Sequence, residues 1–395
     1  MKLMGFVVPA AVRVATAPAL LMVACGAVLE QDALLAQDLV HYRFDGGCGS
    51  EAIGFAPGSP RGQIATTSAG GISGARVPGA FGTALSGSTP GLDSTRVDTG
   101  WMPDTPSGDF SIAMWLRNHA GNPATIPFGY VFGATGAQLR LYIGSSGRLQ
   151  LDGFPANTLT ATDLTSRLNS GWVHVACVVD SGAFEATWYI DGVPEQPDPF
   201  GVPVWVAGTD FTIGARDTAG AFPSPLDIDE FLWREGALLP SEVQALAAGP
   251  RAAIGSYTSG TATPCGAAGA LTLDATGGEP ALGNSAFALR VTPASNSLSV
   301  LVVGLDRCQI QGQSSPPGPP LPLDAGALLA EFAGCQLLAE PLVLQASVGS
   351  GSSTTPLPIP AALTGFPTVY AQALSLDLST LQASNTLGLA VATGL

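Results

Sequence analysis

The chain has 395 residues and a formal net charge of −15, from 30 acidic residues against 15 Lys and Arg. Its 50 glycines and 32 prolines, with only 11% charged residues, are typical of short strands joined by tight turns, and its length allows two or three domains. The negative charge excludes the electrostatic attraction that drives binding to phosphate backbones, so we expect no nucleic-acid partner. A cation such as calcium is compatible with this charge.

Residues 1–36 have the layout of an export signal. A basic start leads into an uncharged run over residues 14–29, which is shorter than the ~20 residues that a membrane span requires. We predict cleavage after Ala36, which leaves no transmembrane segment in the mature chain. Two alternatives are a lipoprotein, with Met22–Cys25 as the lipobox and Cys25 lipidated, and a plain membrane anchor.

Five cysteines follow the predicted signal, so at least one of them is unpaired within the chain. An exported protein can form disulfides. None of their spacings is CxxC, which argues against a zinc ribbon or a thioredoxin-like motif. Cys177 lies on one side of an alternating strand, where a buried free thiol is the simpler interpretation than a reactive one. The five are Cys48, Cys177, Cys265, Cys308 and Cys335.

Strand signals recur along the first part of the chain. Apolar residues alternate with others over residues 110–116, 139–143 and 184–190, which is the period of a half-buried strand. Asp191-Gly192 then predicts a tight hairpin turn. A short helix is predicted from Pro240 to Gly249, because proline suits its first turn and glycine its end. The pattern indicates a sandwich or jellyroll that ends near residue 250.

Several segments resemble the laminin-G-like, concanavalin A-type jellyrolls. They match the family's opening strand, its glycine-containing turn, three further strands and its closing acidic strand and helix. The resemblance implies such a jellyroll over residues 37–250, and an adhesion or recognition unit whose partner is a glycan or an extracellular protein. The segments are Asp38–Asp45, Phe81–Leu85, Phe110–Leu116, Trp172–Ala176, Tyr189–Val193 and Ile228–Phe231.

The same resemblance implies one calcium ion where the first and last strands meet, with Asp45 and Asp229 as the matching carboxylates. Calcium takes ~6 to 8 oxygen ligands, so backbone carbonyls would have to supply the rest. The alternative is that Asp229 only accepts hydrogen bonds from neighbouring backbone. Calcium is the one cofactor that the sequence predicts.

The acidic strand at residues 226–231 also raises a catalytic alternative. Glycosidases that share this jellyroll carry Glu-x-Asp-x-Glu on one strand face. A simple alternation predicts that Asp227, Asp229 and Phe231 share that face, with Glu230 on the other. A phenylalanine in place of the general acid argues against this hydrolase, so we predict no enzymatic activity and keep an atypical polysaccharide hydrolase as the alternative.

Other residues that often carry chemistry have structural interpretations here. Lys2 is the only lysine, and the three histidines are far apart in sequence, which excludes lysine-dependent mechanisms and an HExxH metal site. We expect Trp115, Trp172 and Trp188 to pack within strands rather than to stack on sugars. His174 is expected to be structural as well.

Residues 256–395 predict a second, smaller all-β domain. Apolar strands recur after a glycine-rich entry, with an extended proline run at 316–322 between two of them. Residues 356–360 and the segments after them resemble a C-terminal tail module of exported multi-domain bacterial proteins. That resemblance implies a disulfide between Cys265 and Cys335. The whole chain is therefore predicted as an all-β, extracellular or cell-surface binding protein.

Overall fold

The computed structural model describes most of the chain beyond residue 37. The described residues are 38–45, 51–55, 62–89, 91–101, 108–134, 139–153, 156–201, 211–257, 265, 271–293, 295–305, 321, 323–325, 335–339, 341–362, 368–380, 382–386 and 388–394. The predicted export signal, Cys25, Cys48, Cys308 and the proline run to Pro320 lie outside them. Within these ranges no helix has the length and apolar character needed to cross a membrane.

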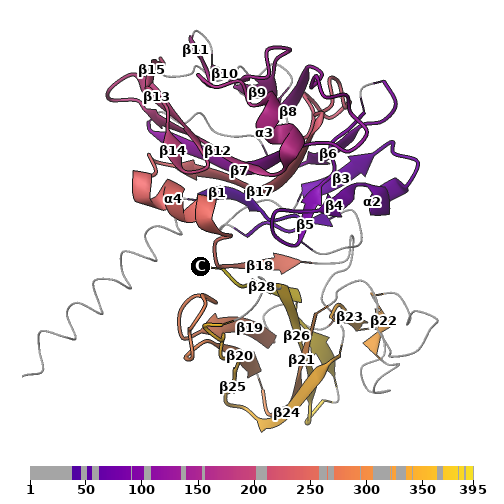
Figure 1. The fold of residues 1–395 in the computed structure, drawn as a ribbon. Helices are drawn as coiled ribbons and strands as arrows, with labels where there is room; N and C mark the ends of the chain where they lie inside the picture. The colour runs from indigo at the N-terminus through magenta and orange to yellow at the C-terminus, as the bar shows by residue number, and fades with distance from the viewer. Residues whose placement is uncertain are drawn as a thin grey trace, which may run out of the picture. The chain divides into compact units, whose positions relative to one another are not determined.

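The first part of the chain folds into two facing antiparallel sheets (Figure 1). One has nine strands in the order β14-β13-β12-β7-β17-β5-β4, and β1 and β15 pair with β17 and β13. Its central pair, β7 and β17, carries the predicted acidic segment. The strands are β1 Asp38–Tyr42, β4 Arg76–Pro78, β5 Thr83–Leu85, β7 Phe110–Asn118, β12 Val173–Asp180, β13 Glu185–Ile190, β14 Val193–Pro194, β15 Asp198–Pro199 and β17 Leu226–Glu235.

The opposite sheet has eight strands in the order β11-β10-β9-β8-β16-β6-β3-β2. Two short helices, α2 (Gly71–Gly74) and α3 (Thr165–Ser170), lie in connections from this sheet to the nine-stranded sheet. The strands are β2 Glu51–Ala52, β3 Gly62–Thr66, β6 Thr95–Asp98, β8 Gly129–Gly133, β9 Arg140–Ile143, β10 Leu149–Gly153, β11 Ala156–Leu159 and β16 Thr212–Ile213.

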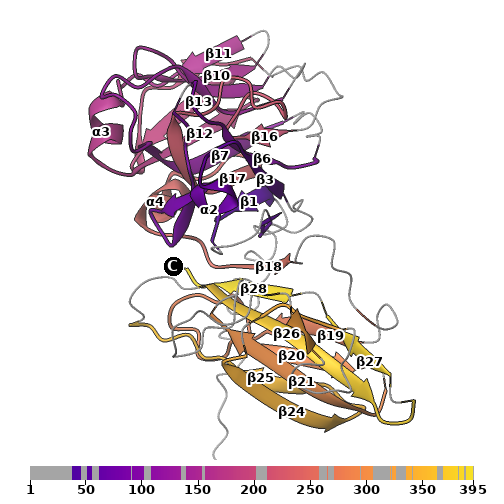
Figure 2. The ribbon, with the colours of Figure 1, turned by 90° about the vertical axis from the view of Figure 1, so that its right-hand side faces the viewer.

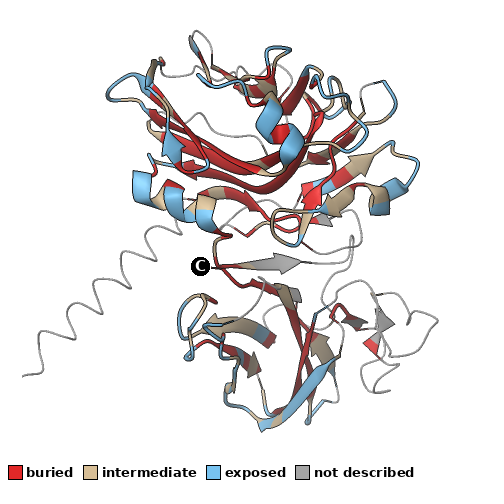
Figure 3. Cartoon of the chain, viewed as in Figure 1, coloured by how far each residue is buried: buried red, intermediate tan, exposed pale blue. Residues whose placement is uncertain are grey.

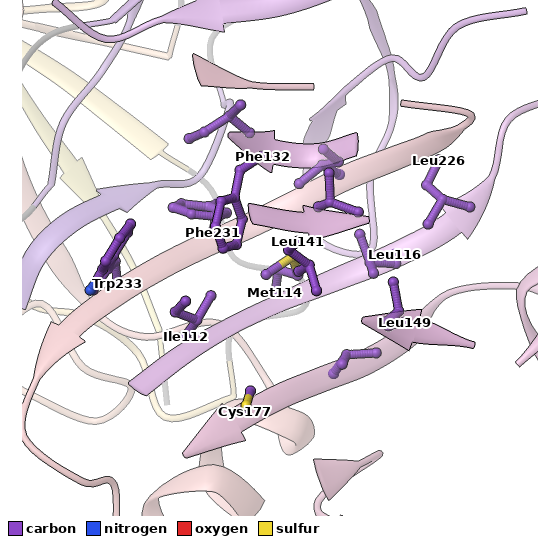
Figure 4. Packing of buried hydrophobic residues seen from close by; sticks show 14 of the residues in the cluster. Ile112, Met114, Leu116, Phe132, Leu141, Leu149, Cys177, Leu226, Phe231 and Trp233 are labelled. Atoms are coloured by element: carbon purple, nitrogen blue, oxygen red, sulfur yellow. The ribbon is translucent and has the colours of Figure 1, made fainter. Parts of the chain in front are cut away.

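Alternate residues of both sheets meet in one hydrophobic core. In β7, Ile112, Met114 and Leu116 point into it (Figure 4). Facing strands contribute Leu141 and Leu149, as the period of two requires. The predicted free thiol is confirmed, because Cys177 is unpaired and buried in this core. The strands predicted at 110–116, 139–143 and 184–190 are thus confirmed as β7, β9 and β13.

Local turn and cap chemistry follows the sequence closely. Asp191 and Gly192 have φ angles of 50° and 77°, and they connect Ile190 to its partner Val193 in a two-residue hairpin. Helix α4 (Pro240–Ala248) packs its apolar side on the outer face of the nine-stranded sheet and leaves its other side exposed (Figure 3). Leu239 precedes it without a capping side chain, and the Glu242 carboxylate accepts the Leu239 N–H at 2.6 Å instead.

The C-terminal part forms a second set of β-sheets (Figure 2). A six-stranded sheet has the order β18-β28-β26-β21-β24 with β27 beside β26, and a three-stranded sheet has the order β19-β20-β25. The recurring apolar strands predicted for this region are thus present. They are β18 Ala253–Tyr257, β19 Leu271–Thr276, β20 Ala288–Pro293, β21 Ser297–Gly304, β22 Leu323–Asp324, β23 Gln336–Leu337, β24 Val343–Gly349, β25 Ser353–Pro356, β26 Thr368–Asp377, β27 Ala383–Asn385 and β28 Gly388–Ala392.

The central strands β21 and β26 of the six-stranded sheet are buried on both faces, whereas its edge strand β24 is largely exposed. In β21, Val300 and Val302 join one hydrophobic cluster, whereas Leu301 and Val303 join the other. A sheet covered on both sides needs apolar residues at consecutive positions, which explains the unbroken apolar run of this strand. The Cys265–Cys335 disulfide lies at the first cluster, so the pairing implied by the tail-module resemblance is present.

Candidate functional site

The carboxylates predicted to bind calcium lie where β1 meets β17, beneath the turn at residues 79–83. Asp45 Oδ1 accepts the N–H of Thr83 at 3.1 Å, and Asp229 Oδ2 accepts the N–H of Phe81 at 3.1 Å. A side chain at Gly79 would place its Cβ 2.5 Å from Asp229 Oδ2. A Cβ at Gly82, within the Phe81–Leu85 motif, would meet Asp45 in the same way, so the two glycines let the turn close over both acids.

Arg43 supplies the positive charge of this site. Its Nε lies 3.2 Å from Asp45 Oδ2 and 3.0 Å from Glu230 Oε1, and its side chain is fully buried. Burial would lower the pKa of Arg43, but Glu230, Asp45 and Asp229 together raise it. His41 Nε2 lies 3.2 Å from Glu230 Oε2. We call Arg43, Asp45, Asp229 and Glu230 the acid–arginine cluster.

Three carboxylates lie around one guanidinium in this cluster, and burial makes the ionisation of Asp45 and Asp229 costly. Burial raises the pKa of Asp45 to about 6, against the opposing effect of Arg43. Burial also raises the pKa of Asp229 well above its usual range, and the nearby charge of Glu230 adds to the shift. Asp229 Oδ1 accepts the N–H of Glu230 at 2.9 Å, which partly offsets this effect.

As arranged, the residues do not fit a calcium ion. Each oxygen of Asp229 already accepts a backbone N–H, and Asp45 binds Thr83, Arg43 and the hydroxyl of Thr368. The described residues contain no group of three or more His, Cys, Asp or Glu side chains able to hold a metal. A calcium ion would have to displace Arg43 or share its carboxylates, so calcium binding at Asp45 and Asp229 stays a prediction.

The prediction that Phe231 shares a face with Asp227 and Asp229 is wrong. Asp229 pairs with Trp115 and Leu232 with Ala113, so two residues of β17 bulge out of register between them. Glu230 adopts a φ of 47° there. The bulge turns Phe231 into the core, where it packs on Phe132 at 5.9 Å (Figure 4), and places Glu230 beside Arg43.

Asp227 is equally enclosed. Its Oδ1 accepts the Gly87 N–H at 2.8 Å and lies 2.8 Å from His119 Nδ1, while its Oδ2 lies 2.7 Å from Arg117 Nη2. Its side chain has no exposed area. The hydrogen bond to Asp227 raises the pKa of His119, which burial opposes. Both carboxylates of the suspected catalytic face are therefore occupied by the protein itself.

His174 and the predicted structural tryptophans lie nearby. The His174 ring packs on Trp115 at 5.4 Å, and its Nδ1 has no hydrogen-bond partner within the described residues. Burial lowers the pKa of His174 to about 4. His41, His174, Trp115 and Glu230 line a cavity of about 10 Å³, which is close to the size of one water and far too small for a sugar.

Trp115 and Trp188 pack within strands, as the sequence predicts, whereas Trp172 directly precedes β12 and is half-buried. Trp188 is buried in the core with its Nε1 donating to Thr158 Oγ1 at 3.0 Å, and Trp115 lies edge-on to Phe81 at 5.4 Å. Trp172 holds the guanidinium of Arg117 4.6 Å from its ring centre.

Sequence reasoning missed an aromatic cluster on the eight-stranded sheet. Phe128 lies 5.4 Å from both Tyr130 and Tyr142 and 5.8 Å from Phe222, between ring centres. Tyr130 and Tyr142 are cross-strand neighbours on β8 and β9, 5.3 Å apart. Tyr142 alternates with the buried Leu141 along β9, and this pattern alone predicts that the Tyr142 side chain points outward. We call these four residues the aromatic platform.

Comparison with known proteins identifies the jellyroll. Residues 92–244 match the family model of the concanavalin A-like lectin/glucanases superfamily, of laminin G type. Over these residues the chain is similar to that superfamily. The match leaves the C-terminal part of the chain uncovered, so its resemblance to a tail module stays a prediction. A search of curated proteins gave no match.

Several solved structures are similar to this concanavalin A-like jellyroll at low identity. One is the binding domain of Paraclostridial Mosquitocidal Protein 1 (13% identity, TM-score 0.40, 54% of this chain and 52% of that chain). Another is domain 4 of AbnA, a GH43 extracellular arabinanase from Geobacillus stearothermophilus, in complex with arabinotriose (24% identity, TM-score 0.36, 54% of this chain and 98% of that chain). A third is the botulinum neurotoxin serotype D binding domain (9% identity, TM-score 0.40, 91% of this chain and 93% of that chain). The chain spans about half the length of the first of these.

Proposed function

We propose that the chain is an exported, non-catalytic binding protein whose jellyroll recognises a glycan outside the cell or at its surface. The superfamily of residues 92–244 includes both lectins and glucanases, so the choice depends on the acidic strand. Asp227 and Asp229 have no exposed area, and the oxygens of both carboxylates are bound by the protein. Retaining hydrolysis needs a free nucleophile beside a proton donor, and this arrangement favours binding instead.

The disulfide supports the proposed location. Cys265 and Cys335 are paired, and structural disulfides persist mainly in oxidising compartments outside the cytoplasm. The export signal predicted over residues 1–36 lies outside the described residues and agrees with this location. Fractionation of cells that express the full chain would test the proposal, and a cytoplasmic, reduced protein would contradict it.

A glycan array and a hydrolysis assay test the function together. We expect the purified full chain to bind at least one glycan and to release no reducing sugar from laminarin, agarose or xyloglucan. Turnover that disappears in Asp227→Asn would restore the hydrolase alternative. Absence of glycan binding, with capture of a defined extracellular protein, would move the proposal to a protein partner.

A further inference from the structure

The aromatic platform has an exposed half and an anchored half. Phe128 is 42% exposed and Phe222 is 50% exposed, whereas Tyr130 is buried and Tyr142 is half-buried. A contiguous group of exposed aromatic rings on a soluble protein commonly marks a binding surface. The two tyrosines beneath fix the orientation of the two phenylalanines.

Phe222 is held in place by several contacts. Its backbone has a φ of 50°, a conformation that costs a non-glycine residue about 1 kcal/mol or more. Its carbonyl accepts the Tyr130 N–H at 3.1 Å, and the Arg216 guanidinium lies 4.9 Å from its ring centre. Arg216 in turn pairs with Asp217 at 2.9 Å. The exposed ring is therefore fixed on the sheet before any ligand arrives.

Polar side chains continue the platform across β9 and β10. Gln150 lies opposite Tyr142 and Asp152 opposite Arg140 in the strand register. Asp152 Oδ1 accepts from Gln150 Nε2 at 2.6 Å and from the Tyr142 hydroxyl at 3.4 Å. Burial and the Asp152 charge raise the pKa of Tyr142 to about 12, so its hydroxyl keeps its proton. Asn157 is exposed beside Asp152 on β11.

One acceptor of this group, Asp152 Oδ2, remains available to a ligand. The described residues supply no hydrogen-bond donor to Asp152 Oδ2, whose other oxygen binds Gln150 and Tyr142, whereas Arg140 Nε is buried. Neighbouring strands lie about 4.8 Å apart, so Tyr130, Tyr142 and Gln150 form a row about 10 Å long. This is about the length of two linked pyranose rings.

We propose that the aromatic platform, with Arg140, Gln150 and Asp152, is a binding site for an uncharged polysaccharide chain. A pyranose ring has an apolar C–H face and a rim of hydroxyls, which matches aromatic rings that border a carboxylate, an amide and a guanidinium. The chain's net charge of −15 disfavours polyanionic glycans. This inference rests on the proposed glycan-binding function and assigns its site.

A matched pair of phenylalanines provides the test. Phe184 resembles Phe222 in exposure (60%) and in φ (55°), but it lies in the turn between β12 and β13. Binding of the full chain to neutral polysaccharides is measured by affinity electrophoresis in gels containing laminarin, xyloglucan or agarose. We expect Phe128→Ala and Phe222→Ala each to weaken binding about tenfold, as loss of an aromatic anchor does, while Phe184→Ala leaves it unchanged.

Two further outcomes separate this inference from the function on which it rests. Wild-type binding that Phe128→Ala and Phe222→Ala do not change would place the glycan elsewhere and overturn the inference, while the proposed function stands. A wild-type chain that binds a charged glycan on the array but no neutral polysaccharide would overturn the inference alone, and a chain that binds no glycan at all would overturn both. Far-ultraviolet circular dichroism and thermal unfolding confirm that each variant is folded before its binding is compared.

Discussion

Arg43 and Glu230 form a buried ion pair, with 3.0 Å between Nε and Oε1, that exists only because β17 bulges. In a regular strand, Glu230 would point to the face opposite Asp229. Its φ of 47° instead brings both acids to the same guanidinium. The bulge thus assembles the acid–arginine cluster, and it also removes Phe231 from the face that a hydrolase would use.

Loss of Arg43 should be strongly destabilising. Arg43→Gln leaves Asp45, Asp229 and Glu230 close together in a buried site, and removal of one partner of a buried ion pair costs about 3 to 5 kcal/mol. Chemical denaturation of the full chain measures this loss. Arg290→Gln is the control, since Arg290 and Asp274 are exposed and 3.5 Å apart and such pairs contribute about 1 kcal/mol or less.

A double variant keeps this prediction testable if Arg43→Gln does not fold. Adding Glu230→Gln removes one of the uncompensated charges, so Arg43→Gln/Glu230→Gln should be more stable than Arg43→Gln alone. Equal stability of the single and double variants would show that the two side chains are not coupled.

His174 should make the protein less stable at acid pH. Its folded-state pKa of about 4 lies below the ordinary value of 6.5, so the unfolded chain takes up the proton more readily. Stability from this group is complete above pH 6.5 and is lost as the pH falls towards 4, by about 3 kcal/mol. The groups that face its cavity are His41, Glu230 and Arg251. Denaturation of wild type and His174→Gln from pH 7 to 4 measures the difference.

His119 provides a control of opposite sign. Asp227 raises the pKa of His119 in the folded state. His119 therefore stabilises the fold at a pH below the pKa of the unfolded state, and this stabilisation is lost as the pH rises through the folded-state pKa. His119→Gln should therefore increase the acid loss that His174→Gln reduces. The same slope in both variants would contradict the assigned environments.

Calcium binding at Asp45 and Asp229 predicts a weak, specific response. Calcium must compete with Arg43 and with backbone N–H groups for these oxygens, so a site here would bind no more tightly than a Kd of about 10⁻⁴ to 10⁻³ M, as in extracellular calcium modules. Millimolar CaCl₂, but not MgCl₂, should raise the Tm of wild type and not of Asp45→Asn. A Tm that does not change in millimolar calcium would contradict calcium binding at these two carboxylates.

The strands and turns were accessible from sequence because local patterns determine them. Alternating apolar residues predicted β7 and β13, and Asp191-Gly192 predicted the hairpin that the positive φ angles confirm. The bulge was not accessible. A glutamate with a φ of 47° is unfavourable locally. Contacts with His41, 189 residues earlier in the chain, and with the nearby Arg43 stabilise it.

The aromatic platform escaped sequence analysis for a related reason. Phe128, Tyr130, Tyr142 and Phe222 come from two strands and two loops, and only the pairing of β8 with β9 and the loop contact from Phe222 to Tyr130 bring them together. None has a distinctive motif. Only tryptophans stand out from sequence as candidate sugar-stacking residues. Trp188 is in the core, however, and Trp115 packs against Phe81 and His174.

The Cys265–Cys335 disulfide should make a large contribution to the stability of the C-terminal sheets. It closes a loop of 70 residues beside the cluster that includes Leu337 and Leu374, and on the entropic model such a crosslink stabilises by about 4 kcal/mol. Cys265→Ala/Cys335→Ala should lower the denaturation midpoint accordingly. Dithiothreitol should lower the midpoint of the wild type and of Cys177→Ala, because Cys177 is unpaired, but not that of the double variant. Non-reducing peptide mapping checks the pairing directly, and a Cys308–Cys335 peptide from exported protein would contradict it.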